Sequence, residues 1–379
     1  MDLTLTDDQR LIADTAREVL TARHDTAGFK AVAREATGYS AALWKEMVDL
    51  GWPGLPVPES YGGVGLGFLE LCLLLEEAGR AGVPSPLTST VACCALPIAR
   101  YGTEAQKQQW LGAIVQGSVM TYVRAAPGGR WGATGSHVTV TESVDALTLD
   151  GTALFVPYAQ AADDLLVVAQ GSTPGGPGAA GGDGGLTVLL VDAGSAGITR
   201  EPLDTVGAER MCRVDFANVK VPGDRVLGED GAAVVEAIEQ YGAAATCAEM
   251  VGGAQAVLDR SVEYATQREQ FGKPIGAFQA VQHHCANMAI DVLGSRFLAY
   301  EAIWRLSAGL DAATEVSAAK AWVSEAYQRV CSLGHQVHGA IGFTAEHELH
   351  WYLRHAIASA LALGDGDFHT EQIARRLGL

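Results

Sequence analysis

The chain has few basic residues for its size, and this shortage limits what it can bind. Its 379 residues include 26 Lys and Arg against 44 Asp and Glu, for a formal net charge of -18. Nucleic-acid binding needs a basic stripe or patch, so this balance argues against a DNA or RNA partner. The charge also favours a protein kept in solution by self-repulsion. A few local arginines would still suffice to hold an anionic cofactor.

Long apolar runs and paired cysteines are also missing. No run reaches the roughly 18 apolar residues expected of a membrane span. The start, Met1 to Asp8, lacks the basic and apolar regions of a signal peptide. We therefore expect a cytoplasmic protein with no membrane association. The 7 cysteines are odd in number and show no CxxC spacing, so reduced, buried thiols are expected rather than zinc ligands or disulfides.

Histidines gather in the C-terminal third, but their spacing does not match a metal site. They are His335, His338, His347, His350, His355 and His369. No His-Glu-x-x-His or similar ligand frame occurs among them. Isolated histidines usually serve as plain polar residues. The sequence therefore predicts no metal site.

What the chain does have is 48% hydrophobic residues, enough for a large core. Residues 1–120 carry apolar positions at three- and four-residue spacing, which predicts helices. These predicted helices cover 7–21, 41–50, 67–79, 87–101 and 103–116. Thr103 followed by Gln106 forms a capping box at the start of the last one. We expect an N-terminal helical domain over 1–120.

The pattern changes twice after this domain. Residues 121–228 contain short β-rich runs at 137–140, 146–149, 165–168, 186–191 and 213–216, which predict a small sandwich or barrel. The glycine-rich stretch 171–185 is predicted to be a flexible loop between two strands. Residues 229–379 return to helices at 232–267, 279–309, 312–337 and 345–362, which fits an antiparallel four-helix bundle. The predicted class is α+β, with these three domains in order.

This order resembles the acyl-CoA dehydrogenase family over nearly the whole chain. The resemblance is carried by 58–65 (PESYGGVG), 76–79 (EEAG), 101–111 (YGTEAQKQQWL), 216–222 (FANVKVP), 264–272 (YATQREQFG) and 336–343 (QVHGAIGF). Any one of these stretches is weak, but together and in the family's order they are specific. They imply the family fold and FAD-dependent oxidation of an acyl-CoA. An electron-transferring flavoprotein is the implied electron acceptor.

The resemblance also implies an FAD site shared between subunits. One subunit holds the isoalloxazine ring, and a neighbour holds the adenine and pyrophosphate. The residues assigned to the second role are Arg268, Phe271, Phe278, Gln279, Gln336, Val337, His338, Gly339 and Ala340. A guanidinium can pair with phosphate oxygens through two hydrogen bonds, and Gly339 has no Cβ to block close approach. Taken alone, Arg268 would fit a surface arginine at a helix end, but its context favours the cofactor.

Residues expected around the flavin ring depart from the family pattern. The loop that usually reads Thr-Glu-Pro-x-x-Gly-Ser-Asp is here the segment from Arg124 to Arg130, which has no Ser, Thr, Asp or Glu. The usual Trp-Ile-Thr segment reads Phe155-Val156-Pro157, which loses a hydroxyl and a backbone donor. The Asp-x-x-Arg pair that holds the substrate falls on Gln240 and Ala243.

Dehydrogenation needs a carboxylate to remove the α-proton. The sequence departs from the family pattern at the positions of this catalytic base as well. One family position for this glutamate falls on Gly242. The other, in a Glu-Gly-Thr turn, is best matched by Asp365-Gly366-Asp367 after a two-residue shift. Asp365 is therefore the candidate base, although Asp and Gly are also frequent in turns after helices. Glu249, two helical turns beyond Gly242, is expected to be a structural partner in the bundle.

These matches and departures predict one subunit of an FAD-dependent acyl-CoA dehydrogenase. It would supply the adenine and pyrophosphate half of the FAD site to a catalytic sister subunit, in a heterotetramer. The amino-acid sequence of these stretches is most similar to the heteromeric branch that some actinobacteria use on steroid side chains and other bulky thioesters. Two alternatives stay open: a self-sufficient homo-oligomeric acyl-CoA dehydrogenase with Asp365 as base, and a flavin-free structural or acyl-CoA-binding relative.

Overall fold

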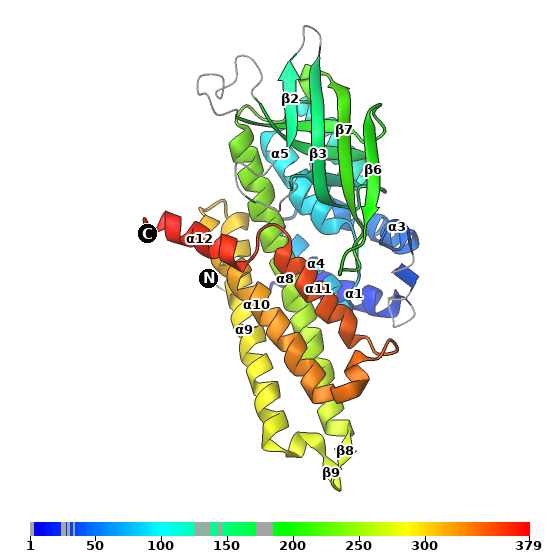
Figure 1. Cartoon of the computed structure of the whole chain (residues 1–379), viewed down its shortest axis with the longest axis vertical. Helices are drawn as coiled ribbons and strands as arrows, with labels where there is room; N and C mark the ends of the chain where they lie inside the picture. Colours follow the sequence, from blue (N-terminus) through cyan, green and yellow to red (C-terminus); the bar gives the residue numbers. More distant parts are fainter. Residues whose placement is uncertain are drawn as a thin grey trace.

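The computed structural model describes residues 4–23, 28, 31–32, 35–125, 131, 137–142, 146–171 and 185–379, and the structural statements below concern these residues. Figure 1 shows a β domain at one end of the long axis and a helical bundle reaching to the other. Within the described ranges, no helix combines the length and the hydropathy needed to cross a bilayer.

The N-terminal part is helical, as predicted. Its elements are α1 (Asp7–Arg23), α3 (Ala41–Asp49), η1 (Trp52–Gly54), η2 (Glu59–Tyr61), α4 (Phe68–Ala81), η3 (Thr88–Ala95), α5 (Leu96–Tyr101), α6 (Glu104–Gln106), η4 (Lys107–Leu111) and α7 (Gly112–Val115). Thr103 Oγ1 accepts from the Gln106 backbone N–H at 3.2 Å, and Gln106 Oε1 accepts from the Thr103 N–H at 3.0 Å. The predicted capping box is confirmed. Two of the expected helices contain π-helical turns, η3 and η4. The spacing of apolar residues did not predict these turns.

The middle part forms one 7-stranded mixed sheet. Its strands are β1 (Met120–Val123), β2 (Val138–Glu142), β3 (Leu147–Pro157), β4 (Asp164–Gln170), β5 (Leu186–Asp192), β6 (Ile198–Leu203) and β7 (Met211–Val221). They run in the order β1-β4-β2-β3-β7-β6, with β5 also paired to β4. The predicted glycine-rich loop lies outside the described residues from 172 to 184. The Gly171 N–H donates to the Gly185 carbonyl at 2.9 Å, so the two ends of that connection meet.

The C-terminal part contains the predicted helices and one more. Its elements are η5 (Gly223–Arg225), α8 (Gly231–Gln267), β8 (Glu269–Gln270), β9 (Lys273–Pro274), η6 (Ile275–Ala277), α9 (Gln279–Ser307), α10 (Ala313–His338), η7 (Gly339–Phe343), α11 (Leu349–Leu361) and α12 (Gly366–Arg376). The four-helix prediction missed α12. Its start was taken for a turn, because Asp365 and Gly366 fit a turn as well as a helix start.

Helices α4 and α8 touch backbone to backbone. A Cβ on Gly79 of α4 would lie 2.0 Å from the carbonyl oxygen of Glu249 on α8. A Cβ on Gly252 of α8 would lie 1.8 Å from the carbonyl oxygen of Glu76 on α4. Only glycine fits at either position, so these two residues fix how closely the N-terminal domain packs on the bundle.

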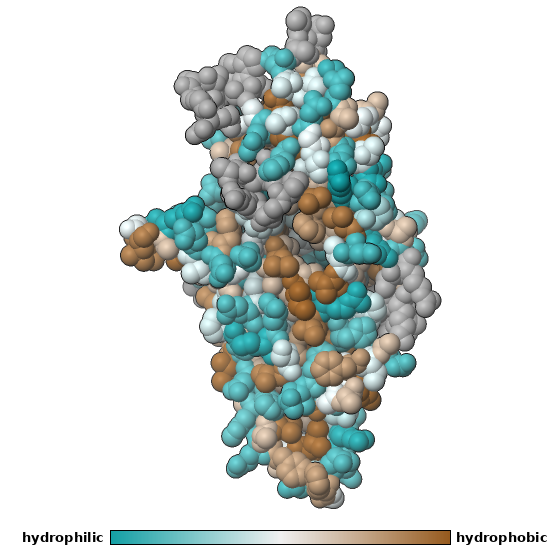
Figure 2. Space-filling model, viewed as in Figure 1, coloured by the Kyte–Doolittle hydropathy of each residue, from teal (hydrophilic) through white to brown (hydrophobic). Residues whose placement is uncertain are grey.

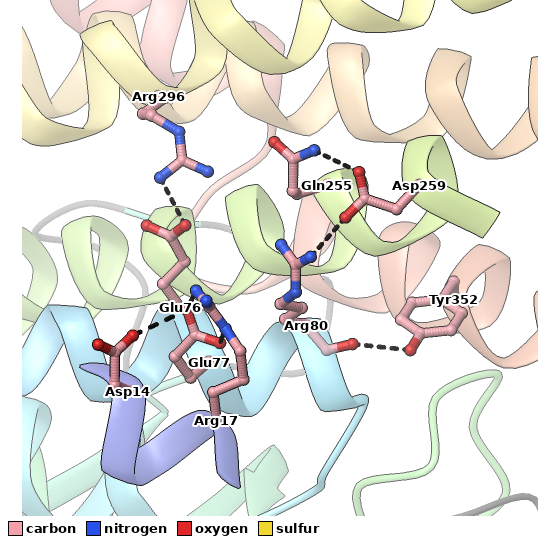
Figure 3. Close-up of polar contacts among 9 residues, drawn as sticks. All are labelled: Asp14, Arg17, Glu76, Glu77, Arg80, Gln255, Asp259, Arg296 and Tyr352. Atoms are coloured by element: carbon pink, nitrogen blue, oxygen red, sulfur yellow. Dashed lines mark hydrogen bonds and ion pairs between the residues drawn. The ribbon is translucent and has the colours of Figure 1, made fainter. Parts of the chain in front are cut away.

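Buried ion pairs hold further helices to this contact (Figure 3). Glu76 and Glu77 on α4 are 7% and 4% exposed, and both are paired. Glu76 pairs with Arg296 of α9, and Glu77 pairs with Arg17 of α1. A third residue of α4, Arg80, pairs with Asp259 of α8. A buried carboxylate is tolerated when it is paired in this way, so the network joins α1, α8 and α9 to α4.

Replacing Gly252 with alanine should destabilise the protein. The added methyl would overlap the Glu76 carbonyl, and overpacking of this kind costs on the order of 3 kcal/mol. Urea denaturation at fixed protein concentration measures the change. Gly112→Ala is the matched control, because a Cβ there has nothing within 4 Å, and it should leave stability unchanged or raise it slightly. Equal midpoints for Gly252→Ala and wild type would contradict the close-contact argument.

Candidate functional site

Residues predicted to hold the dinucleotide meet at the end of the bundle farthest from the β domain (Figure 1). Arg268 follows α8 directly, is exposed, and its backbone N–H donates to the Tyr264 carbonyl at 2.8 Å. Phe271 and Gly272, with φ of 54° and 78°, form the two-residue turn between β8 and β9. Positive φ at both positions is the geometry of a tight hairpin turn. Phe271 is 92% exposed, and Figure 2 shows apolar surface at this end.

Phe278 and Gln279 stand at the start of α9 beside this hairpin. The Phe278 and Phe271 rings meet edge to face at 6.1 Å, and Lys273 Nζ lies 4.4 Å from the Phe278 ring centre. Among the described residues no side chain caps the N-terminus of α9, which begins at Gln279. The N–H groups at a helix start attract anions. Two cationic side chains and a helix N-terminus thus gather where a pyrophosphate was predicted.

The segment at the end of α10 lies at the same end of the bundle. Gln336, Gly339 and Ala340 are exposed, whereas Val337 and His338 are buried. The His338 ring stacks on Tyr264 of α8 at 4.5 Å, and its Nδ1 bonds to the Gly334 carbonyl at 2.8 Å. Gly339 has φ 66°, and a Cβ there would meet nothing within 4 Å. The buried side chains therefore position the turn, and Gly339 offers open backbone to a ligand.

Two residues from the segments that depart from the family pattern, Arg124 and Gln240, line a different cavity, of about 260 Å³, between the β domain and the bundle. Arg124 from the ring loop lies in its wall with a side chain only 1% exposed. Its Nε and Nη2 donate to Glu239 Oε1 on α8 at 3.2 and 3.1 Å. The rest of the loop, 126–130, lies outside the described residues. The described end of this loop therefore contributes a buried ion pair to the cavity wall.

Gly242, one family position for the catalytic base, packs against Leu363, which lies in the cavity wall and carries no carboxylate. A Cβ on Gly242 would lie 2.7 Å from Leu363 Cδ1. Leu363 is 2% exposed with φ 57°. Asp365 is exposed, and its Oδ1 accepts from the Phe368 N–H at 2.8 Å, which caps α12. This placement favours the capping role of Asp365 over the role of base.

Other polar residues of the cavity are already engaged with one another. Gln240, at the substrate-binding position, donates to Glu236 at 2.9 Å, and Ala243 is fully buried. The carboxylates in the wall are Glu236 and Glu239. Arg376 pairs with Glu236 at 3.2 Å, and Arg124 pairs with Glu239. The described part of the cavity wall therefore presents no unpaired carboxylate to an acyl thioester.

A buried lysine holds the turn at Leu363 in place. Lys320 of α10 is 0% exposed, and its Nζ donates to the carbonyls of Gly364 and Ala360 at 2.8 and 3.1 Å. His369 Nε2 bonds to the Leu363 carbonyl at 3.0 Å. Burial lowers the pKa of Lys320 to about 8. Sequence reasoning missed Lys320, because one lysine within a helix carries no motif.

The two ends of α8 differ in the groups that they present. At the hairpin end, Arg268 has no ion-pair partner among the described residues, and Gly339 leaves open space. At the other end, the Arg124–Glu239 pair and Leu363 line the wall of the cavity. Gly242 and Arg268 are 26 positions apart on α8, about 40 Å at ~1.5 Å per residue. The two groups of residues therefore lie far apart within one subunit.

Comparison with known proteins confirms the family resemblance. The family model for the acyl-CoA dehydrogenase N-terminal domain matches residues 6–118, and the model for its C-terminal domain matches 229–378. The chain is 30% identical over 374 residues to the short-chain specific acyl-CoA dehydrogenase of Megasphaera elsdenii, covering 94% of both chains. The solved ChsE4–ChsE5 complex of Mycobacterium tuberculosis matches at 29% identity and TM-score 0.91, over 100% of this chain and 99% of that one. The Tcur3481–Tcur3483 steroid ACAD matches at 28% and 0.88, over 99% of both.

The buried Lys320 should give stability an alkaline pH dependence. Its pKa is near 10.5 in the unfolded chain and about 8 in the folded one. Between these values the unfolded chain holds a proton that the folded chain has lost, so the contribution of Lys320 rises with pH, by up to ~3 kcal/mol. Urea midpoints of wild type and Lys320→Met at pH 7.5 and pH 10 test this. The difference between the two proteins should shift in favour of wild type at pH 10, and parallel profiles would refute the assignment.

Proposed function

The chain belongs to the acyl-CoA dehydrogenase family, and we propose that it acts there as a partner-dependent subunit. Members of this family are FAD-dependent oxidoreductases that act on a CH–CH bond. In this proposal the chain binds the adenine and pyrophosphate end of an FAD whose ring and catalytic base belong to a sister subunit. The single observation that carries it is the contrast between the two ends of α8, open to an anion at Arg268 and filled by Arg124 and Leu363 at the other.

The chain's own residues would bind and orient the cofactor. When bound, the flavin supplies the acceptor for the hydride that leaves the acyl thioester. Arg268 would neutralise pyrophosphate charge through its two parallel donors, and the start of α9 would add backbone N–H groups. Gly339 would let the adenosine end approach the backbone. Proton removal would fall to the sister subunit, since Gly242 has no proton acceptor and the Asp365 carboxylate caps α12.

An exposed apolar row supports assembly with another subunit. Ile290, Leu293 and Phe297 of α9 are 66%, 53% and 49% exposed, at the spacing that puts side chains on one helix face. Contiguous exposed apolar surface marks protein interfaces. Two of the structural neighbours carry the names of two chains each, ChsE4–ChsE5 and Tcur3481–Tcur3483. We propose the same heteromeric arrangement here.

The steroid in the name of the second neighbour supports a bulky acyl-CoA as substrate of the assembly. We propose an electron-transferring flavoprotein as the acceptor, since the family resemblance implies one. Domain limits at 1–120, 121–228 and 229–379 remain part of the proposal, and β1 and α8 begin within a few residues of them.

Purification with and without a sister subunit tests the proposal. Expressed alone, the chain should be colourless, because it lacks ring contacts. Co-expressed with an acyl-CoA dehydrogenase encoded beside it, it should co-purify as a yellow complex with about one FAD for each pair of chains. Absorbance and released flavin measure the count. A yellow protein that alone reduces a dye with an acyl-CoA would overturn the proposal in favour of a self-sufficient enzyme.

The Arg268→Gln variant tests the binding role directly. Loss of a charge-assisted contact to phosphate should weaken FAD retention in the complex by roughly 10- to 100-fold. Flavin remaining after dialysis gives the readout. Arg375→Gln is the control, since Arg375 is 66% exposed on α12 and pairs only locally with Glu371. If both variants keep as much FAD as wild type, Arg268 does not hold the pyrophosphate.

A further inference from the structure

A small cavity away from the dinucleotide residues brings three metal-ligating side chains together. Glu209 comes from the β6–β7 connection, Glu249 from α8 and His355 from α11. One ligand atom from each lies within 4.8 Å of the other two. The cavity measures about 40 Å³. This volume suits an ion with a water molecule and is too small for an organic substrate.

A buried hydroxyl in the same wall points to a missing partner. Ser85 lines the cavity and is 8% exposed. Its Oγ makes no hydrogen bond to the described residues. Buried polar atoms nearly always have a partner, in the protein or in a bound water or ion. The unsatisfied Ser85 Oγ therefore indicates that something polar belongs in this cavity.

Two of the three ligands are held in place from outside the cluster. Thr88 Oγ1 donates to Glu249 Oε1 at 2.7 Å. The Tyr327 hydroxyl lies 3.4 Å from His355 Nδ1. Contacts of this kind orient the carboxylates and imidazoles that bind metals. No Lys or Arg in the described part of the chain forms a salt bridge with Glu209 or Glu249, so the carboxylate pair has no cation of its own.

We propose that Glu209, Glu249 and His355 bind one divalent cation of the zinc type. Two carboxylates and one imidazole form a ligand set that suits Zn²⁺, and the charge of the ion balances the two carboxylates. Because Glu209 belongs to the β domain and the other two ligands to the bundle, the ion joins these two parts. The site is independent of the proposed FAD role.

Spacing along the sequence could not reveal this site. The ligands are 40 and 106 positions apart, and no motif connects them. The absence of a ligand frame led to the prediction of no metal, which considered only histidines close to one another. Only the packing of α8 against α11 and the β6–β7 connection brings the three side chains together.

Metal analysis of the full-length protein tests the proposal. After dialysis against Zn²⁺ and then against metal-free buffer, wild type should retain about one Zn²⁺ per chain, with a higher Tm than after chelator treatment. Glu249→Gln and His355→Gln should each reduce retained zinc at least tenfold. His283→Gln is the control, because His283 is an exposed histidine of α9 and should leave retention unchanged.

Two results would overturn the proposal. One is wild type that retains no Zn²⁺ or Mn²⁺ and shows no change in Tm when either metal is added. In that case the carboxyls hold protons instead, since burial raises the pKa of Glu209 to about 7 and of Glu249 to about 8. The other is zinc retention that survives Glu209→Gln and His355→Gln. If Glu249→Gln fails to fold, the other two variants and the wild-type measurement still test whether the three residues bind zinc.

Discussion

The backbone contact between α4 and α8 is the constraint on which the rest of this structure depends. With Gly79 and Gly252 pressed against opposite carbonyls, neither helix can slide or rotate without a clash. The paired carboxylates of Glu76 and Glu77 then join α1 and α9 to the same place. Every other position along α8 follows from this contact. Gly242 is thereby directed at the turn that contains Leu363, and Arg268 is placed at the far tip.

The length of α8 separates the ring cavity from the residues predicted to hold the dinucleotide. Its 37 residues run from the β domain to the β8–β9 hairpin, so the ring cavity and the dinucleotide residues lie at opposite ends. The turn at Leu363 keeps a strained shape, with φ 57°, and Lys320 and His369 hold its carbonyls. Strain of this kind is common at catalytic sites.

Sequence reasoning succeeded where the information is local. Helical periodicity located α8 to α10, and the Thr103 capping box was found from two residues. The β8–β9 hairpin that follows Arg268 was not predicted, because its strands have only two residues each. Strand β6 was missed because charged residues and Pro202 on a sheet edge do not alternate with apolar ones. Helix α12 was missed because its first residues are equally good turn formers.

Pairs of residues far apart in the sequence could not be predicted from the sequence. From the sequence, Arg124 stood out only as the first residue of a loop that lacks the hydroxyl groups of the family pattern. Its partner Glu239 is 115 residues away and carries no motif. An arginine this deeply buried needs a carboxylate nearby, because an unpaired buried charge would cost several kcal/mol. The wall of the ring cavity therefore carries a compensated ion pair, in which the Glu239 carboxylate offsets the charge of the buried Arg124 guanidinium.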